Sequence, residues 1–389
     1  MWDLAVREGR YALSDSLFRQ KFGAATPLGH RAMLALVQHD SSSLVRLLEE
    51  ARKSDYQKSV FAAQWISLYL HDFATAEQFA RLGLESGRPV VRDSSERQLA
   101  WLALAQGGWA TARQRFAAVE RGAAGTRQLR ALSATLPFLL VPRDDLEAIL
   151  ADIARWDPGG KPAGVGLEPV PILGPHLRLY LLGLLSSRLG REAEALEHAG
   201  ALEKLAAPGE FMPLVRDLAR TVRADVAWRR HQTAEALRIL DPIQGEIPFD
   251  LLSLPFFSLP FFSEEHARYL RAEALDALGR DREALQWLET AFVGTPAELV
   301  YLAPSHLRQA QLYERLGDRK GAAMHYGQFI RLWKECDPGL QHLVDEARAR
   351  LTQLVGETVL TRFVLPFELL ALLMLAGLMG AIYFARPDE

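Results

Sequence analysis

The residues in this chain that could do chemistry are ten histidines and one cysteine, Cys336, spread over 389 positions. No two histidines have a spacing that would place them on one helix face with a third ligand, as a metal site requires. The sequence also lacks a glycine-rich phosphate loop, a G-x-S-x-G nucleophile motif and an H-E-x-x-H motif. We therefore predict no catalytic residue, no metal site and no cofactor. We interpret Cys336 as an inert thiol, because nothing in the sequence marks a positive environment around it.

Three histidines, His39, His71 and His231, fall near the turns that we predict between helices, and we interpret them as hydrogen-bonded turn residues. The tryptophans are expected mostly in helix–helix cores, since most follow amphipathic patterns. Those within such patterns are Trp65, Trp101, Trp228, Trp287 and Trp333. A binding groove lined by some of them is the alternative, because helical repeat arrays present a concave surface.

The composition limits the class of protein. A chain of 389 residues is too long for one ordinary compact core, so several domains or an elongated repeat array are expected. The net charge is −3 and no run of Lys and Arg forms a phosphate-binding stripe, so we expect no nucleic-acid partner. A single cysteine excludes a disulfide within the chain and fits a reducing compartment.

A sequence pattern recurs along much of the chain. It consists of an apolar helix, a Leu-Gly or similar break, a charged turn, and Ala-Leu on a second helix. Clear copies begin at Leu189, Leu278 and Leu316, and weaker copies with histidine at the turn begin at His71 and His231. Glycine permits the turn, and the small alanine lets the second helix lie close to the first. Each copy therefore predicts a helical hairpin.

These hairpins resemble the tetratricopeptide repeat family. One copy has the family's small, large, Gly, Ala, Ala and Pro positions at Ala272, Leu275, Gly279, Ala284, Ala291 and Pro296. The next copy matches at Ala310, Tyr313, Gly317, Ala322 and Tyr326. The resemblance covers about residues 30–354 and implies an all-α hairpin solenoid that binds a protein or peptide through its groove. It does not identify the partner, because such repeats bind many unrelated proteins.

Two segments interrupt the repeats. Residues 157–175 are rich in Pro and Gly and are predicted to form a long loop that splits the array into halves. Residues 241–263 contain Leu-Pro-Phe-Phe-Ser twice in succession, which a regular helix cannot accommodate. The four aromatic side chains of this Phe-rich loop are Phe256, Phe257, Phe261 and Phe262. They either tuck under the repeats or form a docking patch for a partner or a membrane surface.

The C-terminal region predicts a transmembrane helix over residues 363–385. Val364 to Ala385 contains one charged residue, Glu368, and spans roughly 33 Å as a helix, close to the thickness of a bilayer core. Ala376 with Gly380, and Gly377 with Ala381, form two pairs of small residues that let membrane helices approach closely. Glu368 lies near one end, so it either reaches the interface or makes a polar contact with another subunit.

This helix resembles the last transmembrane helix of the J subunit of bacterial NADH–quinone oxidoreductase. The positions that match are Pro366, Phe367, Glu368, Gly380, Ala381, Ala385 and Arg386. The resemblance covers about 30 residues, and the other membrane helices of that subunit have no counterpart here, so neither quinone chemistry nor proton pumping follows. It implies a helix that packs against integral membrane subunits.

Charge around the helix predicts its orientation. Arg348, Arg350 and Arg362 precede the apolar segment, whereas Arg386 alone follows it. The positive-inside rule then places the repeats on the cytoplasmic side of a bacterial inner membrane, with the chain single-pass and tail-anchored in the bilayer. The charged residues at the N-terminus agree, because a signal peptide would be apolar there.

The predicted fold is therefore all-α, a tetratricopeptide-like helical hairpin solenoid plus one C-terminal transmembrane helix. The predicted order is N-terminal repeats 1–156, loop 157–175, C-terminal repeats 176–354 with the Phe-rich loop 241–263, linker 355–362, transmembrane helix 363–385 and tail 386–389.

Three functions are compatible with this organisation. The first is a non-catalytic accessory or scaffold subunit of a membrane complex such as respiratory complex I or a photosynthetic reaction centre. The second is a membrane-anchored adaptor that binds soluble proteins in assembly or signalling, and the third is an enzyme. The small-residue faces of the C-terminal helix favour stable membership of a complex.

Overall fold

The computed structural model is all-helical in the part of the chain that it describes, which confirms the all-α part of the predicted fold class. The described residues are 5–6, 8–23, 26–53, 56–119, 126–158, 173–207, 209–243, 264–289 and 296–384. The Phe-rich residues of the predicted docking loop, Phe256, Phe257, Phe261 and Phe262, lie outside these ranges, so that prediction stays open.

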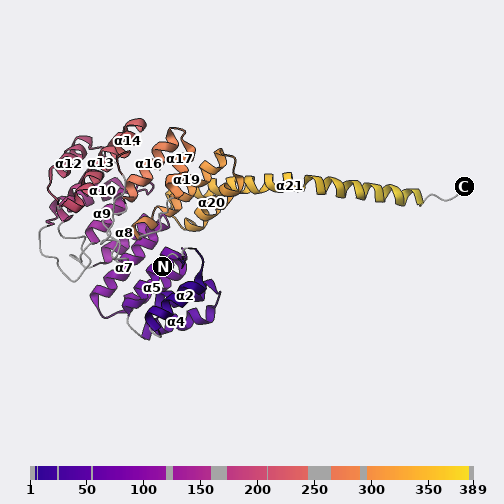
Figure 1. The fold of residues 1–389 in the computed structure, drawn as a ribbon, viewed down its shortest axis with the longest axis horizontal. Coiled ribbons are helices and arrows are strands. Elements are labelled where there is room, and N and C mark those ends of the chain that lie inside the picture. The colour runs from indigo at the N-terminus through magenta and orange to yellow at the C-terminus, as the bar shows by residue number, and fades with distance from the viewer. Residues whose placement is uncertain are drawn as a thin grey trace.

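The N-terminal half is a succession of antiparallel helices (Figure 1). They are α2 (Tyr11–Phe22), α3 (Leu28–Val37), α4 (Ser41–Lys53), α5 (Tyr56–Tyr69), α6 (Phe73–Leu82), the 3-10 turn η2 (Gly83–Glu85), α7 (Pro89–Ala105), α8 (Trp109–Ala118), α9 (Thr126–Thr135) and α10 (Arg143–Arg155).

The C-terminal half continues the pattern. Its elements are α11 (Gly174–Arg188), α12 (Glu192–Lys204), η4 (Gly209–Phe211), α13 (Met212–Arg229), α14 (Thr233–Leu240), α16 (Glu265–Ala277), α17 (Asp281–Glu289), α18 (Pro296–Leu299), α19 (Leu302–Arg315), α20 (Arg319–Leu332), η5 (Pro338–Leu340) and α21 (Gln341–Phe384). Helix α11 begins at Gly174, so the last two residues of the predicted loop 157–175 are already helical.

Seven hairpin turns share one backbone conformation, with a left-handed residue two positions after the last residue of the first helix. Four turns have glycine there, with φ between 71° and 82°: Gly107, Gly190, Gly279 and Gly317. The other three have histidine, with φ between 51° and 58°: His39, His71 and His231. Glycine adopts this conformation without a Cβ clash, and histidine is one of the few other residues found there with some frequency.

Hydrogen bonds close the histidine turns and the glycine turns in the same way. The amide of Gly190 donates to the Ser187 carbonyl (3.0 Å), and the next amide reaches back to Ser186 (2.8 Å). The amide of His231 donates to the Trp228 carbonyl (2.9 Å), and the next reaches Ala227 (2.9 Å). Each pair satisfies carbonyls that would otherwise be unpaired at a helix C-terminus. The turn histidines thus occupy the left-handed position that glycine occupies in the other turns.

The second helix of each hairpin approaches the first at an alanine. Five residues after the left-handed position, six hairpins have an alanine with no exposed surface: Ala76, Ala112, Ala195, Ala236, Ala284 and Ala322. The hairpin of α3 and α4 has Leu44 at this place. A side chain that ends at Cβ lets two helix backbones lie close together, so a larger residue here would force the helices apart.

The array curls back on itself, and its C-terminal helices return beside α7 and α8 (Figure 1). The backbone amide of Asp337 donates to the Gly107 carbonyl (3.1 Å), while its carboxylate accepts from the amide of Ala110 (3.2 Å) at the start of α8. Arg331 donates to the His71 carbonyl (3.1 Å) at the turn between α5 and α6. We call this junction of α20 and η5 with the two N-terminal turns the closing seam.

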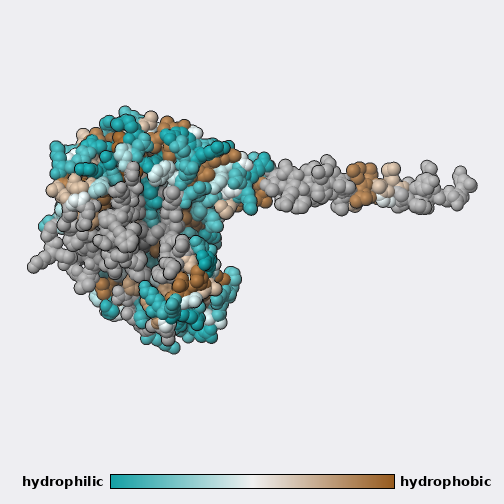
Figure 2. Space-filling view, in the orientation of Figure 1, coloured by the Kyte–Doolittle hydropathy of each residue, from teal (hydrophilic) through white to brown (hydrophobic). Residues whose placement is uncertain are grey.

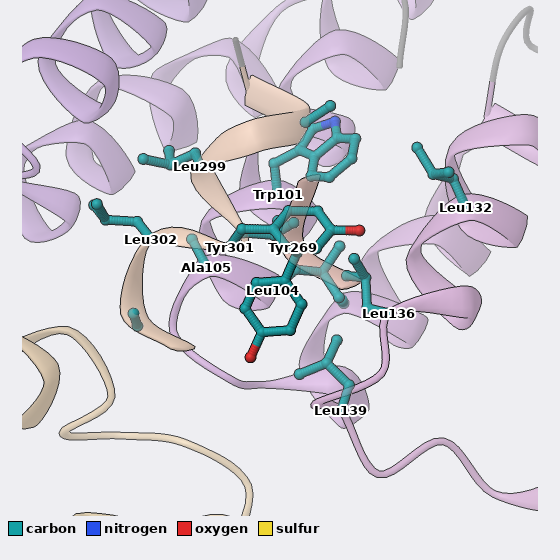
Figure 3. Packing of buried hydrophobic residues seen from close by; sticks show 14 of the residues in the cluster. Trp101, Leu104, Ala105, Leu132, Leu136, Leu139, Tyr269, Leu299, Tyr301 and Leu302 are labelled. Carbon is teal, nitrogen blue, oxygen red and sulfur yellow. The ribbon is translucent and has the colours of Figure 1, made fainter. Parts of the chain in front are cut away.

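Aromatic residues from both halves fill the space inside the curl. Figure 3 shows Trp101 and Leu104 of α7 near Tyr269 of α16 and Tyr301, which follows α18. Phe138, in the segment between α9 and α10, has its ring centroid 5.7 Å from that of Tyr269 and 5.2 Å from that of Tyr301. The two halves therefore share one hydrophobic core.

The last helix leaves the body and runs outward. Helix α21 is continuous over 44 residues, so it passes without interruption through the predicted linker 355–362 into the predicted transmembrane segment 363–385 (Figure 1). Its first turns pack on the body through the buried residues Val344, Ala347 and Leu354. Within the described residues, no helix meets the length and hydropathy needed to cross a membrane.

The left-handed turn at His231 predicts the effect of one substitution. His231→Gly should stabilise the protein by about 0.5–1 kcal/mol, because relief of the left-handed strain exceeds the backbone entropy that glycine adds to the unfolded chain. The matched control, His198→Gly in the middle of α12, should destabilise by roughly 0.5 kcal/mol. Urea unfolding monitored by circular dichroism measures both; equal losses of stability would contradict the turn conformation.

Candidate functional site

A cavity of about 440 Å³ lies between α13, α16 and α19. Aromatic residues form part of its wall, contributed by Phe138, Trp228 and Tyr269. Its charged residues come as two pairs, Asp225 with Arg229 and Glu273 with Arg308. A cavity that combines aromatic surface with fixed charges has the features of a site that binds and orients a ligand.

The centre of the polar wall is Asp225, of which only 2% of the surface is exposed. One carboxylate oxygen accepts from Ser187 Oγ (2.6 Å) and from Arg229 Nε (2.7 Å). The other oxygen lies 3.1 Å from His266 Nε2. Burial by itself would raise the pKa of Asp225, but the His266 hydrogen bond and the Arg229 charge outweigh it and hold the pKa well below its usual range.

The order of the hydrogen-bonded residues decides whether this network could activate a nucleophile. Asp225 lies between Ser187 and His266, whereas a hydrolytic triad needs the imidazole next to the hydroxyl that it deprotonates. The other ring nitrogen of His266 lies 3.4 Å from the Tyr301 hydroxyl. The geometry therefore holds the helices and the cavity wall in place and does not activate a nucleophile at Ser187.

The second charged pair is also fixed. Arg308 donates to both carboxylate oxygens of Glu273, at 2.6 and 2.7 Å. Burial alone would lower the pKa of Arg308, but the adjacent Glu273 carboxylate raises it above its usual value. Two-point pairing of this kind orients both groups, so the cavity presents a rigid arrangement of charge.

A buried carboxyl lies at the start of α16. Glu264 precedes the helix with a left-handed φ of 50° and is 4% exposed. Burial and the nearby Asp217 raise the pKa of Glu264 to about 8. Asp217 is itself paired with Arg220 at 2.6 Å. The carboxyl of Glu264 is therefore mostly protonated at neutral pH.

The apolar part of α21 is the second notable feature. Six large side chains between positions 372 and 379 are 59–70% exposed: Leu372, Leu373, Met374, Leu375, Leu378 and Met379. Figure 2 shows this hydrophobic segment standing clear of the body. Of the predicted packing residues, Ala376 is exposed and a Cβ added at Gly377 would meet nothing within 4 Å. The side chains of Gly380, Ala381 and Glu368 lie outside the described ones.

The structure also shows where the cysteine and the tryptophans singled out from the sequence lie. Cys336 is buried against Trp333 and Gly107, and burial raises the pKa of its thiol, as expected for an inert cysteine. Trp65, Trp101 and Trp333 are buried in the core. Trp228 and Trp287 are partly buried against it, and Trp228 also lines the cavity.

Sequence reasoning missed the network around Asp225. The signal was present in α13, where an ionisable residue stands between Ala224 and Val226 on a run of small apolar residues. A charged residue within such a run is rarely left without a buried partner. Its partners, Ser187 and His266, are about 40 residues away in sequence, so only the packing of α11, α13 and α16 identifies them.

No group of three or more His, Cys, Asp or Glu residues in the described ranges is arranged to hold a metal ion. A comparison of the chain with protein-family models gave no match, and comparisons with curated proteins and with solved structures gave none either.

The raised pKa of Glu264 predicts an effect of pH on stability. A carboxyl whose folded-state pKa is raised contributes stability below its ordinary value of 4.5, which is lost as the pH rises towards about 8. Glu264→Gln cannot ionise, so it should be about 2–4 kcal/mol more stable than the wild type at pH 8 and similar to it at pH 4.5.

Denaturant titrations at the two pH values test this prediction. Glu283→Gln is the control, because that carboxylate is exposed, and it should change stability little at either pH. A Glu264→Gln variant that is destabilised at pH 8 would contradict the protonated state of the Glu264 carboxyl.

Proposed function

We propose that this chain is a non-catalytic accessory or scaffold subunit of a bacterial multisubunit membrane complex that converts energy, such as respiratory complex I or a photosynthetic reaction centre. In this proposal the tetratricopeptide-like repeats cover the cytoplasmic face of the complex. The C-terminal helix spans the inner membrane and packs among the integral membrane subunits, in contact with lipid.

The observation that carries the proposal is the exposure of apolar side chains all around one part of α21. Leu372 to Leu375 are four consecutive residues, so they point to every side of the helix, and all are at least 59% exposed. A soluble partner that covers one face of a helix would need only a stripe of apolar residues. Apolar surface on every side is the pattern of a helix surrounded by lipid and other membrane helices.

The small residues within this segment support packing against other helices. Gly377 has open space where a side chain would be, which leaves room for a second backbone to approach. Ala376, Gly380 and Ala381 complete the two small-residue pairs in the sequence. Glu368, in the first turns of the apolar run, is proposed either to lie at the membrane interface or to make a polar contact with another subunit.

The cavity favours a second candidate function, a membrane-anchored adaptor. Its aromatic walls and paired charges, Arg229 with Asp225 and Arg308 with Glu273, could bind a peptide segment of a soluble protein. We place the scaffold first because the apolar side chains of α21 are exposed and need burial, whereas the charged residues of the cavity already have partners within the chain.

Purification from native membranes distinguishes the two functions. The tagged chain is extracted in mild detergent and captured at low and at high salt, and the proteins recovered with it are identified and quantified. Stoichiometric integral membrane subunits that persist at high salt would support a structural subunit and identify the complex. Recovery of soluble proteins that are lost at modest salt would support the adaptor instead.

Gly380→Leu tests the packing role of the apolar helix. The leucine should hold neighbouring helices apart and reduce recovery of the complex severalfold, while the circular dichroism of the repeats stays unchanged. Gly356→Leu is the matched control, because it makes the same change in α21 before the apolar segment, at a site where an added Cβ meets nothing. An intact complex with Gly380→Leu would show that this face does not pack against a subunit.

A further inference from the structure

Two histidines of the last hairpin meet edge to edge beside the closing seam. The Nδ1 atoms of His306 in α19 and His325 in α20 are 2.8 Å apart. His325 is 7% exposed and stacks on Tyr313, with ring centroids 5.3 Å apart and planes at 17°. At this separation one Nδ1 must donate a hydrogen and the other must accept it, so the accepting imidazole is neutral.

The charges around the pair come from several elements. His306 faces His71, in the turn between α5 and α6, and Arg331 of α20. His325 faces Glu289 at the end of α17 and Asp318 at the start of α20. Arg331 is the residue that donates to the His71 carbonyl across the closing seam. The histidine pair thus lies where the last hairpin joins the N-terminal half.

The pair resists protonation in the folded state. Burial, together with His325, His71 and Arg331, lowers the pKa of His306 to about 3. Burial also lowers the pKa of His325, although Glu289 and Asp318 oppose the change. A proton on the accepting Nδ1 would place two N–H groups against each other at 2.8 Å, and a proton on His306 would add positive charge next to Arg331.

We propose that His306 and His325 form an acid-sensitive clip, in which the neutral pair keeps the closing seam shut and protonation of the pair opens it. Opening separates α20 from the turn between α5 and α6, breaks the Arg331–His71 hydrogen bond, and releases Asp337 from Gly107 and Ala110. The inference is independent of the proposed membrane function, because it concerns the repeat body alone.

The direction and size of the effect follow from linkage. A histidine whose folded-state pKa is lowered contributes stability above its ordinary pKa of 6.5, and that stability is lost as the pH falls below 6.5. If His306 regains its ordinary pKa when the seam opens, the opening constant should rise about tenfold between pH 7.5 and 5.5. His325 adds to this rise in the same direction.

Hydrogen exchange of the full-length chain in detergent measures the opening. The amides of Ala110 and Asp337 report on the closing seam, since both donate across it. Their protection is determined at pH 7.5, 6.5 and 5.5 after correction for the intrinsic pH dependence of exchange. We expect a drop of about tenfold or more at these amides, while the amides inside α13 keep their protection.

Variants assign the effect to the histidine pair. His306→Gln with His325→Gln should make the protection of the seam amides nearly independent of pH between 7.5 and 5.5. His342→Gln is the control, because His342 is exposed in the first turn of α21, and it should behave like the wild type. If the double variant does not fold, His306→Gln alone should reduce the tenfold change.

Two results would overturn the clip. One is a wild-type protein whose seam amides have the same corrected protection at all three pH values. The other is a folded glutamine variant, single or double, that retains the full pH dependence of the wild type.

Discussion

The structure depends on one backbone constraint, a left-handed residue that ends the first helix of each hairpin. Because only three residues separate the two helices, the second helix meets the first at an alanine such as Ala195 or Ala284, whose surface is completely buried. This geometry repeats along the array, and each hairpin can then stack on the next. Without the tight turn, the small residues would not lie opposite the neighbouring backbone.

Repetition alone would give an open array, whereas this chain closes on itself. The closing seam joins Asp337 to Gly107 and Ala110, and a core with aromatic residues from both halves lies behind it. The space that an open array would offer as a groove is therefore partly filled by the chain's own Phe138, Tyr269 and Tyr301. The cavity around Asp225, which Phe138 and Tyr269 line, has a volume of about 440 Å³, and its charged residues are already paired with each other.

Much of the fold could be predicted from local sequence. Leu-Gly breaks followed by alanine at a constant spacing predict the hairpins, and His71 and His231 could be placed at turns because they occupy the position of glycine. The closure could not be predicted, because its contacts join residues more than 220 positions apart, such as Ala110 and Asp337. The network of Asp225 with Ser187 and His266 was missed for the same reason, since it forms only when three helices pack.

The C-terminal helix, unlike the closure, could be characterised largely from the sequence. Its apolar character was evident from the sequence, and the structure adds that Leu372 to Leu375 are exposed on every side of a helix that has left the body. Such a surface is unfavourable in water, by about 25 cal/mol for each Å² of apolar area that stays exposed. This exposed surface and the closed, charge-paired body together favour a protein whose main contacts with partners are made through α21.

The most direct test of this account is extraction of native membranes with alkaline carbonate, which removes peripheral proteins and leaves proteins inserted in the bilayer. We predict that the full-length chain stays in the membrane pellet and that a chain ending at Leu354 is recovered in the supernatant as a folded helical protein. Recovery of the full-length chain in the supernatant would contradict the account, because the apolar surface of α21 would then have to be covered by something other than lipid and membrane helices.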